Sequence, residues 1–150
     1  MFILTEKKRR ITTMILNDGN YVEKAEQVIK GLLADADKES KRKTRGRDQV
    51  KIVSTSKLRN ILAMSSDIYN LANMSVSENL SEDINSQIEY LKIRIIYEAG
   101  RDEDVKDLVT KAKLIECIGE IKGNKKNFIQ FNRYLEAIVA YRKYLGGKDE

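Results

Sequence analysis

Apolar residues recur through most of the chain at the three- and four-residue spacing of an α-helix. The clearest run covers one face of a helix over residues 21–33 and consists of Tyr21, Val22, Ala25, Val28, Ile29, Leu32 and Leu33. The same spacing predicts four further helices, which begin near residues 54–56, 81, 102 and 127. No segment alternates at the period of a strand for long enough to predict a sheet. The pattern therefore predicts an all-α fold, a single domain over residues 1–150 built as a bundle of five to six helices.

Capping residues mark the expected ends of these helices. Ser81, followed by two acids, starts one helix and Gly100 ends it. Asp102 starts a helix expected to continue to near Gly123, and Asn127 caps the last helix. A sixth, shorter helix is expected at the N-terminus, starting at Thr5 and carrying Met14, Ile15 and Leu16.

The segment 34–53 interrupts this order. It is polar and strongly charged, and it lacks apolar periodicity until Val50. Unstructured connections of that length inside a compact domain are usually functional or disordered. We therefore expect a long, mobile, basic loop between two helices.

Charge is concentrated in the same segment. Between Lys38 and Lys51 there are seven basic residues and two acids, so this segment accounts for the chain's whole net charge of +5. From Asn60 to Leu91 there is no Lys or Arg, and five acids form an acidic flank: Asp67, Glu78, Glu82, Asp83 and Glu89. The flank is either a solvated helix face or a docking surface for a basic neighbour, which could be another copy of the chain.

The basic strip is interpreted as a phosphate-binding surface. Lys and Arg neutralise backbone phosphates and release counterions, which gives affinity without sequence preference. Aromatic residues are few near the strip, so backbone contacts are expected rather than base stacking. Hydroxyls at the helix start over 54–56 add an expected anion site. Two alternatives remain, a solvated loop and a loop that docks on an acidic partner protein. The candidate RNA-binding residues are Arg42, Lys43, Arg45, Arg47, Lys51, Lys57 and Arg59.

The residues that are missing argue against catalysis. There is no His, which removes the usual general base and the commonest transition-metal ligand. The single cysteine, Cys117, lies among apolar residues and is expected to be buried. Acids at 102–104 are explained by helix capping, so neither a metal nor a cofactor is expected. A carboxylate-dependent nuclease is a weaker alternative to a protein that is not an enzyme.

No membrane contact is expected either. No run approaches the roughly 20 apolar residues of a membrane span. The early charges at Glu6, Lys7 and Lys8 do not fit a secretory signal. Together with the single cysteine, these features favour a cytoplasmic protein.

Six segments of the chain form a recognisable pattern: Thr55–Leu62, Ile88–Lys92, Tyr97–Arg101, Val105–Lys106, Phe128–Tyr141 and Gly146–Lys148. Together they resemble the small helical subunit of the type III-A (Csm) CRISPR effector complex. The resemblance implies a helical bundle without catalytic activity. Copies would stack along the complex beside its other subunits and contact the backbone of guide RNA paired with target RNA. On the matched segments this role falls to Lys57, Arg59 and Arg101.

Overall fold

The computed structural model of the protein describes residues 14–44, 50–147 and 149, and their side chains except those of 40–44. These residues form six helices and no strand, which confirms the all-α prediction. The helices are α2 (Tyr21–Thr44), α3 (Thr55–Asn73), α4 (Glu82–Arg101), α5 (Glu103–Ala112), α6 (Leu114–Gly119) and α7 (Lys125–Leu145).

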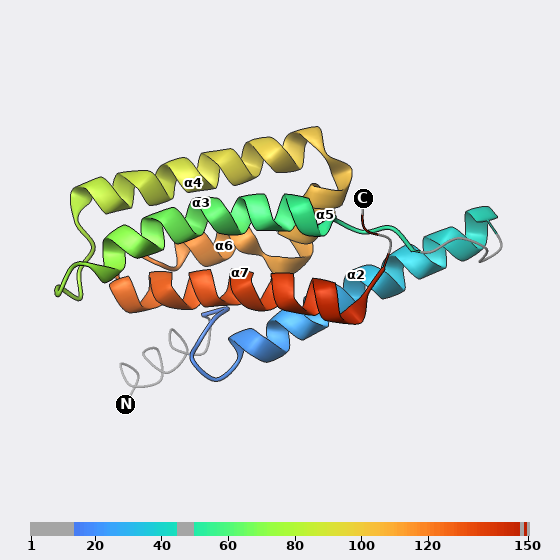
Figure 1. The fold of residues 1–150 in the computed structure, drawn as a ribbon, viewed down its shortest axis with the longest axis horizontal. Helices are drawn as coiled ribbons and strands as arrows, with labels where there is room; N and C mark the ends of the chain where they lie inside the picture. The colour runs from blue at the N-terminus through green and yellow to red at the C-terminus, as the bar shows by residue number, and fades with distance from the viewer. Residues whose placement is uncertain (1–13, 45–49, 148, 150) are drawn as a thin grey trace, which may run out of the picture.

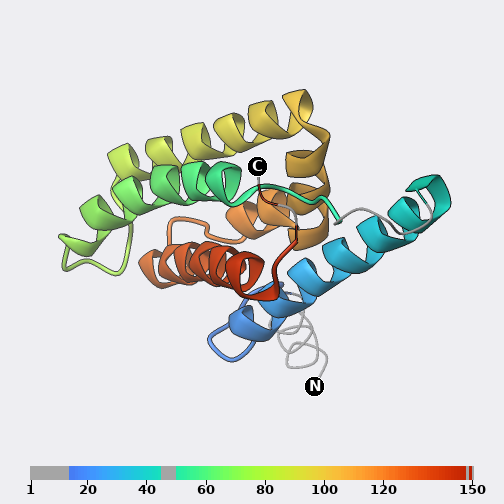
Figure 2. The same ribbon diagram turned by 45° about the vertical axis from the view of Figure 1, so that its right-hand side comes forward.

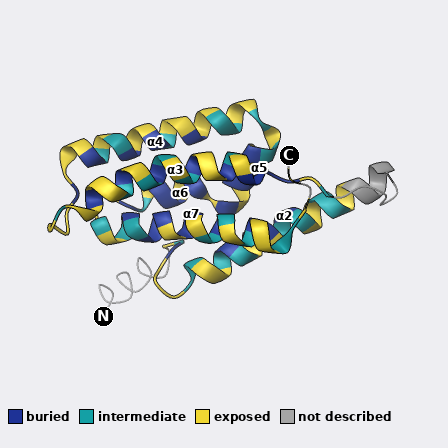
Figure 3. Ribbon diagram, viewed as in Figure 1, coloured by how far each residue is buried: buried dark blue, intermediate teal, exposed yellow. Residues whose placement is uncertain are grey.

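The bundle is built around α7, which packs against both α2 and α3 (Figure 1). Helix α4 packs against α3 and α5 and lies at the edge of the bundle, farthest from α2 (Figures 1 and 2). Apolar side chains from all six helices form one continuous core, and the buried residues of each helix are dark blue in Figure 3. None of the helices in the described part of the chain is long and apolar enough to cross a membrane.

Side-chain caps set the starts of four helices. Ser54, Ser81 and Asp102 accept backbone N–H groups in the first turns of α3, α4 and α5, as the sequence predicts for Ser81 and Asp102. The prediction that Asn127 caps the last helix is wrong. Asn124 is the cap, and its side-chain oxygen accepts the N–H of Asn127 at 3.0 Å.

The single helix predicted to run from Asp102 to near Gly123 is two helices in the structure, α5 and α6. The chain turns at Lys113, which adopts a left-handed conformation with φ of 54° between α5 and α6. The turn aims the apolar residues of both short helices into one core, including Val109 before it and Leu114 after it. No Gly or Pro marks the break, so the continuous apolar pattern predicts one helix.

The predicted loop over 34–53 is wrong in most of its length. Helix α2 continues to Thr44, and its last turns project beyond the bundle (Figures 1 and 2). The stretch 34–44 contains no Gly or Pro, and seven of its eleven residues are Ala, Lys, Arg or Glu, which favour a helix. A helix started by the packed residues 21–33 therefore continues through it. Ile52 and Val53, at the end of the predicted loop, are buried in the core. Residues 45–49 lie outside the described part.

The expected N-terminal helix is tested only at its end. Residues 5–13 lie outside the described part, and Met14, Ile15 and Leu16 are not helical. Leu16 is buried in the core instead, and the N–H of Ile15 donates to the carboxylate of Glu120 at 2.7 Å. Tertiary contacts with α6 and its following turn thus replace local helical bonds.

Candidate nucleic-acid interface

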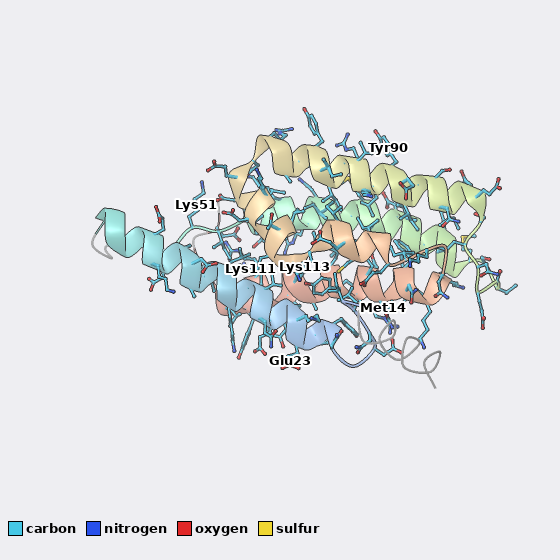
Figure 4. The ribbon with its side chains drawn as sticks, turned by 180° about the vertical axis from the view of Figure 1, so that it is seen from behind. Met14, Glu23, Lys51, Tyr90, Lys111 and Lys113 are labelled. Atoms are coloured by element: carbon cyan, nitrogen blue, oxygen red, sulfur yellow. The ribbon has the colours of Figure 1, made fainter. Side chains whose placement is uncertain are left out.

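The starts of α3 and α5 and the end of α4 meet at one end of the bundle, close to where α2 projects from it (Figure 1). Four of the predicted RNA-binding residues lie at this end, which we call the basic end: Lys51, Lys57, Arg59 and Arg101. Lys51 lies in the segment that connects α2 to α3, on the side seen in Figure 4. The fold therefore gathers side chains from positions 50 residues apart in the sequence.

Lys57 is held by an acid. Its ammonium group, in the first turn of α3, donates to the carboxylate of Asp102. The hydrogen bond raises the pKa of Lys57 and lowers the pKa of Asp102. Asp102 also accepts the N–H groups of Asp104 at 2.9 Å and Val105 at 3.3 Å, as the cap of α5. A phosphate that binds Lys57 must therefore compete with a carboxylate that is already in place.

Arg101 and Arg94 flank a single acid on α4. Their guanidinium groups lie 3.9 and 4.0 Å from Oε1 of Glu98, at the limit of an ion pair. The guanidinium of Arg101 also lies 5.9 Å from the ring centre of Tyr97, within cation–π range. Both arginines are exposed, so most of their N–H groups face solvent.

Arg59 points to solvent from α3. It is exposed, and no ion pair or hydrogen bond joins its side chain to another described residue. Lys51 makes one long contact, 3.8 Å to Asp104. Arg59 is therefore the cation of the basic end that can bind a phosphate without giving up a partner in the described structure.

A groove of about 530 Å³ opens between these charges. Its apolar lining is formed by Ile61, Met64 and Val105. The polar lining residues are Lys57, Asn60, Arg94, Glu98, Arg101 and Asp102. Arg94 belongs to this polar lining and was not among the sequence candidates. Its position seven residues before Arg101 puts both on one helix face, a signal the sequence offered.

The expected anion site at the start of α3 is occupied by the chain itself. The carboxylate of Asp149 accepts the N–H of Thr55 at 2.8 Å and its hydroxyl at 2.7 Å. These bonds lower the pKa of Asp149. Ser54 is used as the cap, through the N–H of Lys57 at 3.2 Å. The hydroxyls at 54–55 are thus committed to internal bonds, which sequence reasoning did not foresee.

The other predicted residues are less defined. Arg42 and Lys43 lie in the last turn of α2, where side chains are not described, and Arg45 and Arg47 lie outside the described residues. Among the residues the structure does describe, no group of acids, Cys or His is arranged to hold a metal ion.

A second group of lysines, which we call the rear lysines, lies on another face of the bundle. Lys24, Lys111 and Lys113 line a small pocket of about 210 Å³ above the buried Tyr134. Figure 4 shows Lys111 and Lys113 side by side at the junction of α5 and α6. Lys111 is paired with Asp35. Lys111 and Lys113 are far from Lys24 in the sequence, so no local sequence pattern indicates this group.

Comparison with known proteins gives a consistent result. Residues 26–148 match the family model described as Csm2 Type III-A. A protein of Streptococcus thermophilus named "CRISPR system Cms protein Csm2" is 36% identical over 135 residues, which cover 90% of this chain and 98% of the relative. Proteins of the same name from Enterococcus italicus and Mycobacterium tuberculosis are 37% and 34% identical over 106 and 98 residues. These matches cover 67% and 65% of this chain and 75% and 79% of the respective relatives.

Proposed function

The chain belongs to the Csm2 family of type III-A CRISPR systems, and on that basis we propose that it is a non-catalytic RNA-binding subunit of a Csm effector complex. In this role it contacts the sugar-phosphate backbone of guide RNA paired with target RNA, and it works beside other Csm subunits. Cleavage falls to those subunits, since the chain has no His to act as a general base.

The cationic groups at the basic end carry this proposal. Arg59 and Arg101 are exposed on adjoining helices, and Lys51 lies on the segment that leads into α3. Arg side chains form paired hydrogen bonds with phosphate oxygens. The basic residues 41–43, in the last turn of α2 where the helix projects from the bundle, add further positive charge beside the basic end. A strand of RNA that crosses the basic end meets several of these groups in succession.

The ion pairs of each cation determine how much affinity a bound phosphate gains from it. Lys57 shares Asp102, so a phosphate gains less there than at Arg59, which has no described partner. The affinity gained at Arg101 lies between those gained at Lys57 and Arg59, because the contact of Arg101 with Glu98 is long and exposed. The bond of Lys57 therefore serves first to join α3 to α5, and Arg59 and Arg101 supply more of the RNA affinity.

Charge is also separated along the molecule. The acids of the acidic flank, defined above, are all exposed, and most of them lie toward the end opposite the basic end. Copies stacked along an RNA duplex would bring the acidic flank of one near the basic end of the next. This supports stacking in several copies, with RNA as the common support.

The test is a salt titration of binding to single-stranded and duplex RNA, measured by fluorescence anisotropy. We expect Arg59→Gln with Arg101→Gln to weaken binding about equally for all sequences. The slope of log K against log salt should fall by about 1.4 to 1.8, near 0.7 to 0.9 for each of the two lost phosphate contacts. The same variant incorporated in the assembled complex should lower its affinity for target RNA.

The matched control is Lys122→Gln with Lys126→Gln, which removes two positive charges near the start of α7, away from the basic end. It should leave the slope nearly unchanged. A third variant, Lys24→Gln with Lys113→Gln, asks whether the rear lysines bind RNA instead. If RNA binds and no variant changes its affinity, the basic end is not the contact surface. If RNA does not bind even at low salt and in the complex, the chain is a protein adaptor rather than an RNA-binding subunit.

A further inference from the structure

The outer face of α4 carries apolar side chains that nothing in the described chain covers. Tyr90, Ile93 and Tyr97 are 60 to 61% exposed, and Ile96 is 50% exposed. They lie on the side of the helix opposite its buried residues, at the edge of the bundle (Figure 3). Figure 4 shows Tyr90 pointing away from the other helices. Contiguous exposed apolar groups of this size usually mark a binding surface.

The spacing of this face is that of a helix–helix contact. Ser86, Tyr90, Ile93, Tyr97 and Gly100 follow one another at intervals of four, three, four and three residues. That is the spacing of the seam between two helices packed lengthwise. We call these five residues the α4 seam.

Gly100 supports the same conclusion. A Cβ atom placed on Gly100 would meet no heavy atom within 4 Å, and Gly100 lies within the helix, before its end at Arg101. A glycine there destabilises the helix without any benefit to packing inside the chain. Close approach of a second helix would account for this glycine, because a side chain at position 100 would keep the two helices apart.

Opposite charges line the two edges of the seam. Glu82 and Glu89 lie along one edge, and Arg94 and Arg101 lie along the other. In a parallel pair of identical helices, an acid on one edge faces the base five residues later on its partner. Glu89 of each copy then faces Arg94 of the other, twice by symmetry. An antiparallel pair would set acid against acid and base against base.

We propose that two copies of this chain pair side by side through the α4 seam, with their α4 helices parallel. The contact is closed by a two-fold axis along the helices, so it produces a dimer and does not extend into a filament. The dimer forms without RNA, although the edges of its contact share Glu82 and Glu89 with the acidic flank and Arg101 with the basic end.

The available area predicts a weak dimer. The four large apolar side chains expose on the order of 400 Å² per copy, whereas a stable complex buries about 800 Å² per partner. The flanking ion pairs add specificity rather than much affinity. We expect a dissociation constant between about 10 µM and about 1 mM.

The experiment is sedimentation equilibrium of the full chain, free of RNA, from about 10 µM to about 1 mM. The wild-type chain should shift from monomer to dimer over this range. Glu89→Arg alone and Arg94→Glu alone should each place like charges across the seam and raise the dissociation constant at least about tenfold. Mixing the two single variants should restore association as a heterodimer, because each then supplies the charge the other needs.

The controls are Glu116→Arg and Arg133→Glu, which make the same charge changes at exposed positions on α6 and α7. They should dimerise as the wild type does, and circular dichroism should show that all variants fold. A wild-type chain that stays monomeric at about 1 mM would overturn the proposal and assign the face to a different protein. Single variants that dimerise normally, or a mixture that remains monomeric, would overturn the parallel pairing.

Discussion

Lys57 and Asp102 join the first turn of α3 to the residue that precedes α5 through a bond between their charged groups, although they are 45 residues apart in sequence. The acid of the pair is also the cap of α5. Lys57, proposed from the sequence as an RNA contact, therefore also holds α3 against the start of α5. We expect this ion pair to help position its neighbours Arg59 and Arg101 at the basic end.

The double role of Asp102 can be separated by substitution. Asp102→Ala removes both the cap and the ion pair, and should lower the free energy of unfolding by about 1 to 2 kcal/mol. Asp102→Asn keeps an oxygen that can cap α5 and should lower it by less than about 1 kcal/mol. Urea unfolding followed by circular dichroism measures both. Equal losses would mean that the cap contributes nothing.

Stability should fall in acid. The pKa of Asp102 is lowered by its bond to Lys57, and the pKa values of Asp18, Asp35 and Asp149 are lowered by hydrogen bonds to Gln130, Lys111 and Thr55 respectively. A carboxyl whose pKa is lower in the folded state stabilises the fold above its unfolded value, near 3.8, and loses that contribution as the pH falls through the folded pKa.

We therefore expect a nearly constant free energy of unfolding from about pH 7 to about pH 5 and a progressive loss below about pH 4. Asp102→Asn should make that loss smaller, because the group no longer titrates. The control is Asp67→Asn on the exposed side of α3, which removes a carboxylate that bonds to no other described residue. It should reduce the acid loss less than Asp102→Asn does. On the alkaline side, the raised pKa of Lys57 gives stability that is present below about 10.5 and lost as the pH rises through the folded pKa.

Two glycines should respond to alanine in opposite directions. Gly100 lies in α4 with open space at its Cβ position, so Gly100→Ala should raise the stability of the monomer by about 0.5 to 1 kcal/mol. Gly147 has φ of 105°, and a Cβ there would lie 3.2 Å from Leu33 Cδ2. Gly147→Ala should destabilise the fold by about 1 kcal/mol or more. Thermal unfolding of the two variants, compared at one dilute protein concentration, tests the contrast.

Cys117 should be inert in the folded protein. It is 2% exposed, and burial raises the pKa of its thiol to about 12. The reactive thiolate is therefore scarce at neutral pH and also inaccessible. A chromogenic disulfide reagent should label Cys117 at the rate of unfolding, and denaturant should accelerate labelling in step with loss of helical signal. Rapid labelling of the folded chain would contradict the buried position.

Helices with a strong apolar stripe and a polar start could be predicted without the structure. The helix after Ser81 and the caps at Ser81 and Asp102 are local features, since a hydroxyl or carboxylate three residues from the N–H it accepts needs no distant partner. Family resemblance followed from segments of the chain and was confirmed by the match over residues 26–148.

Errors arose where packing overrides local pattern. The turn at Lys113 follows Ala112, whose carbonyl accepts the hydroxyl of Tyr134 from α7, and the N–H of Ile15 donates to Glu120 at the end of α6. No local spacing in the sequence indicates these contacts. The reverse error occurred in α2, where the lack of an apolar stripe suggests a loop over 34–44. Helix propensity continues the helix through this polar segment, and Ala36 packs against the core while Asp35 pairs with Lys111.

The sequence by itself determined that the molecule is helical, that it has a positive net charge and no histidine, and to which family it belongs. Only the tertiary structure decided which charges are neighbours. It paired Lys57 with Asp102, filled the start of α3 with Asp149, and left Arg59 free of described partners and the α4 seam uncovered. The physical reason is distance, because electrostatic and apolar contacts depend on separation in space, and the packing of helices brings together residues from opposite ends of the chain.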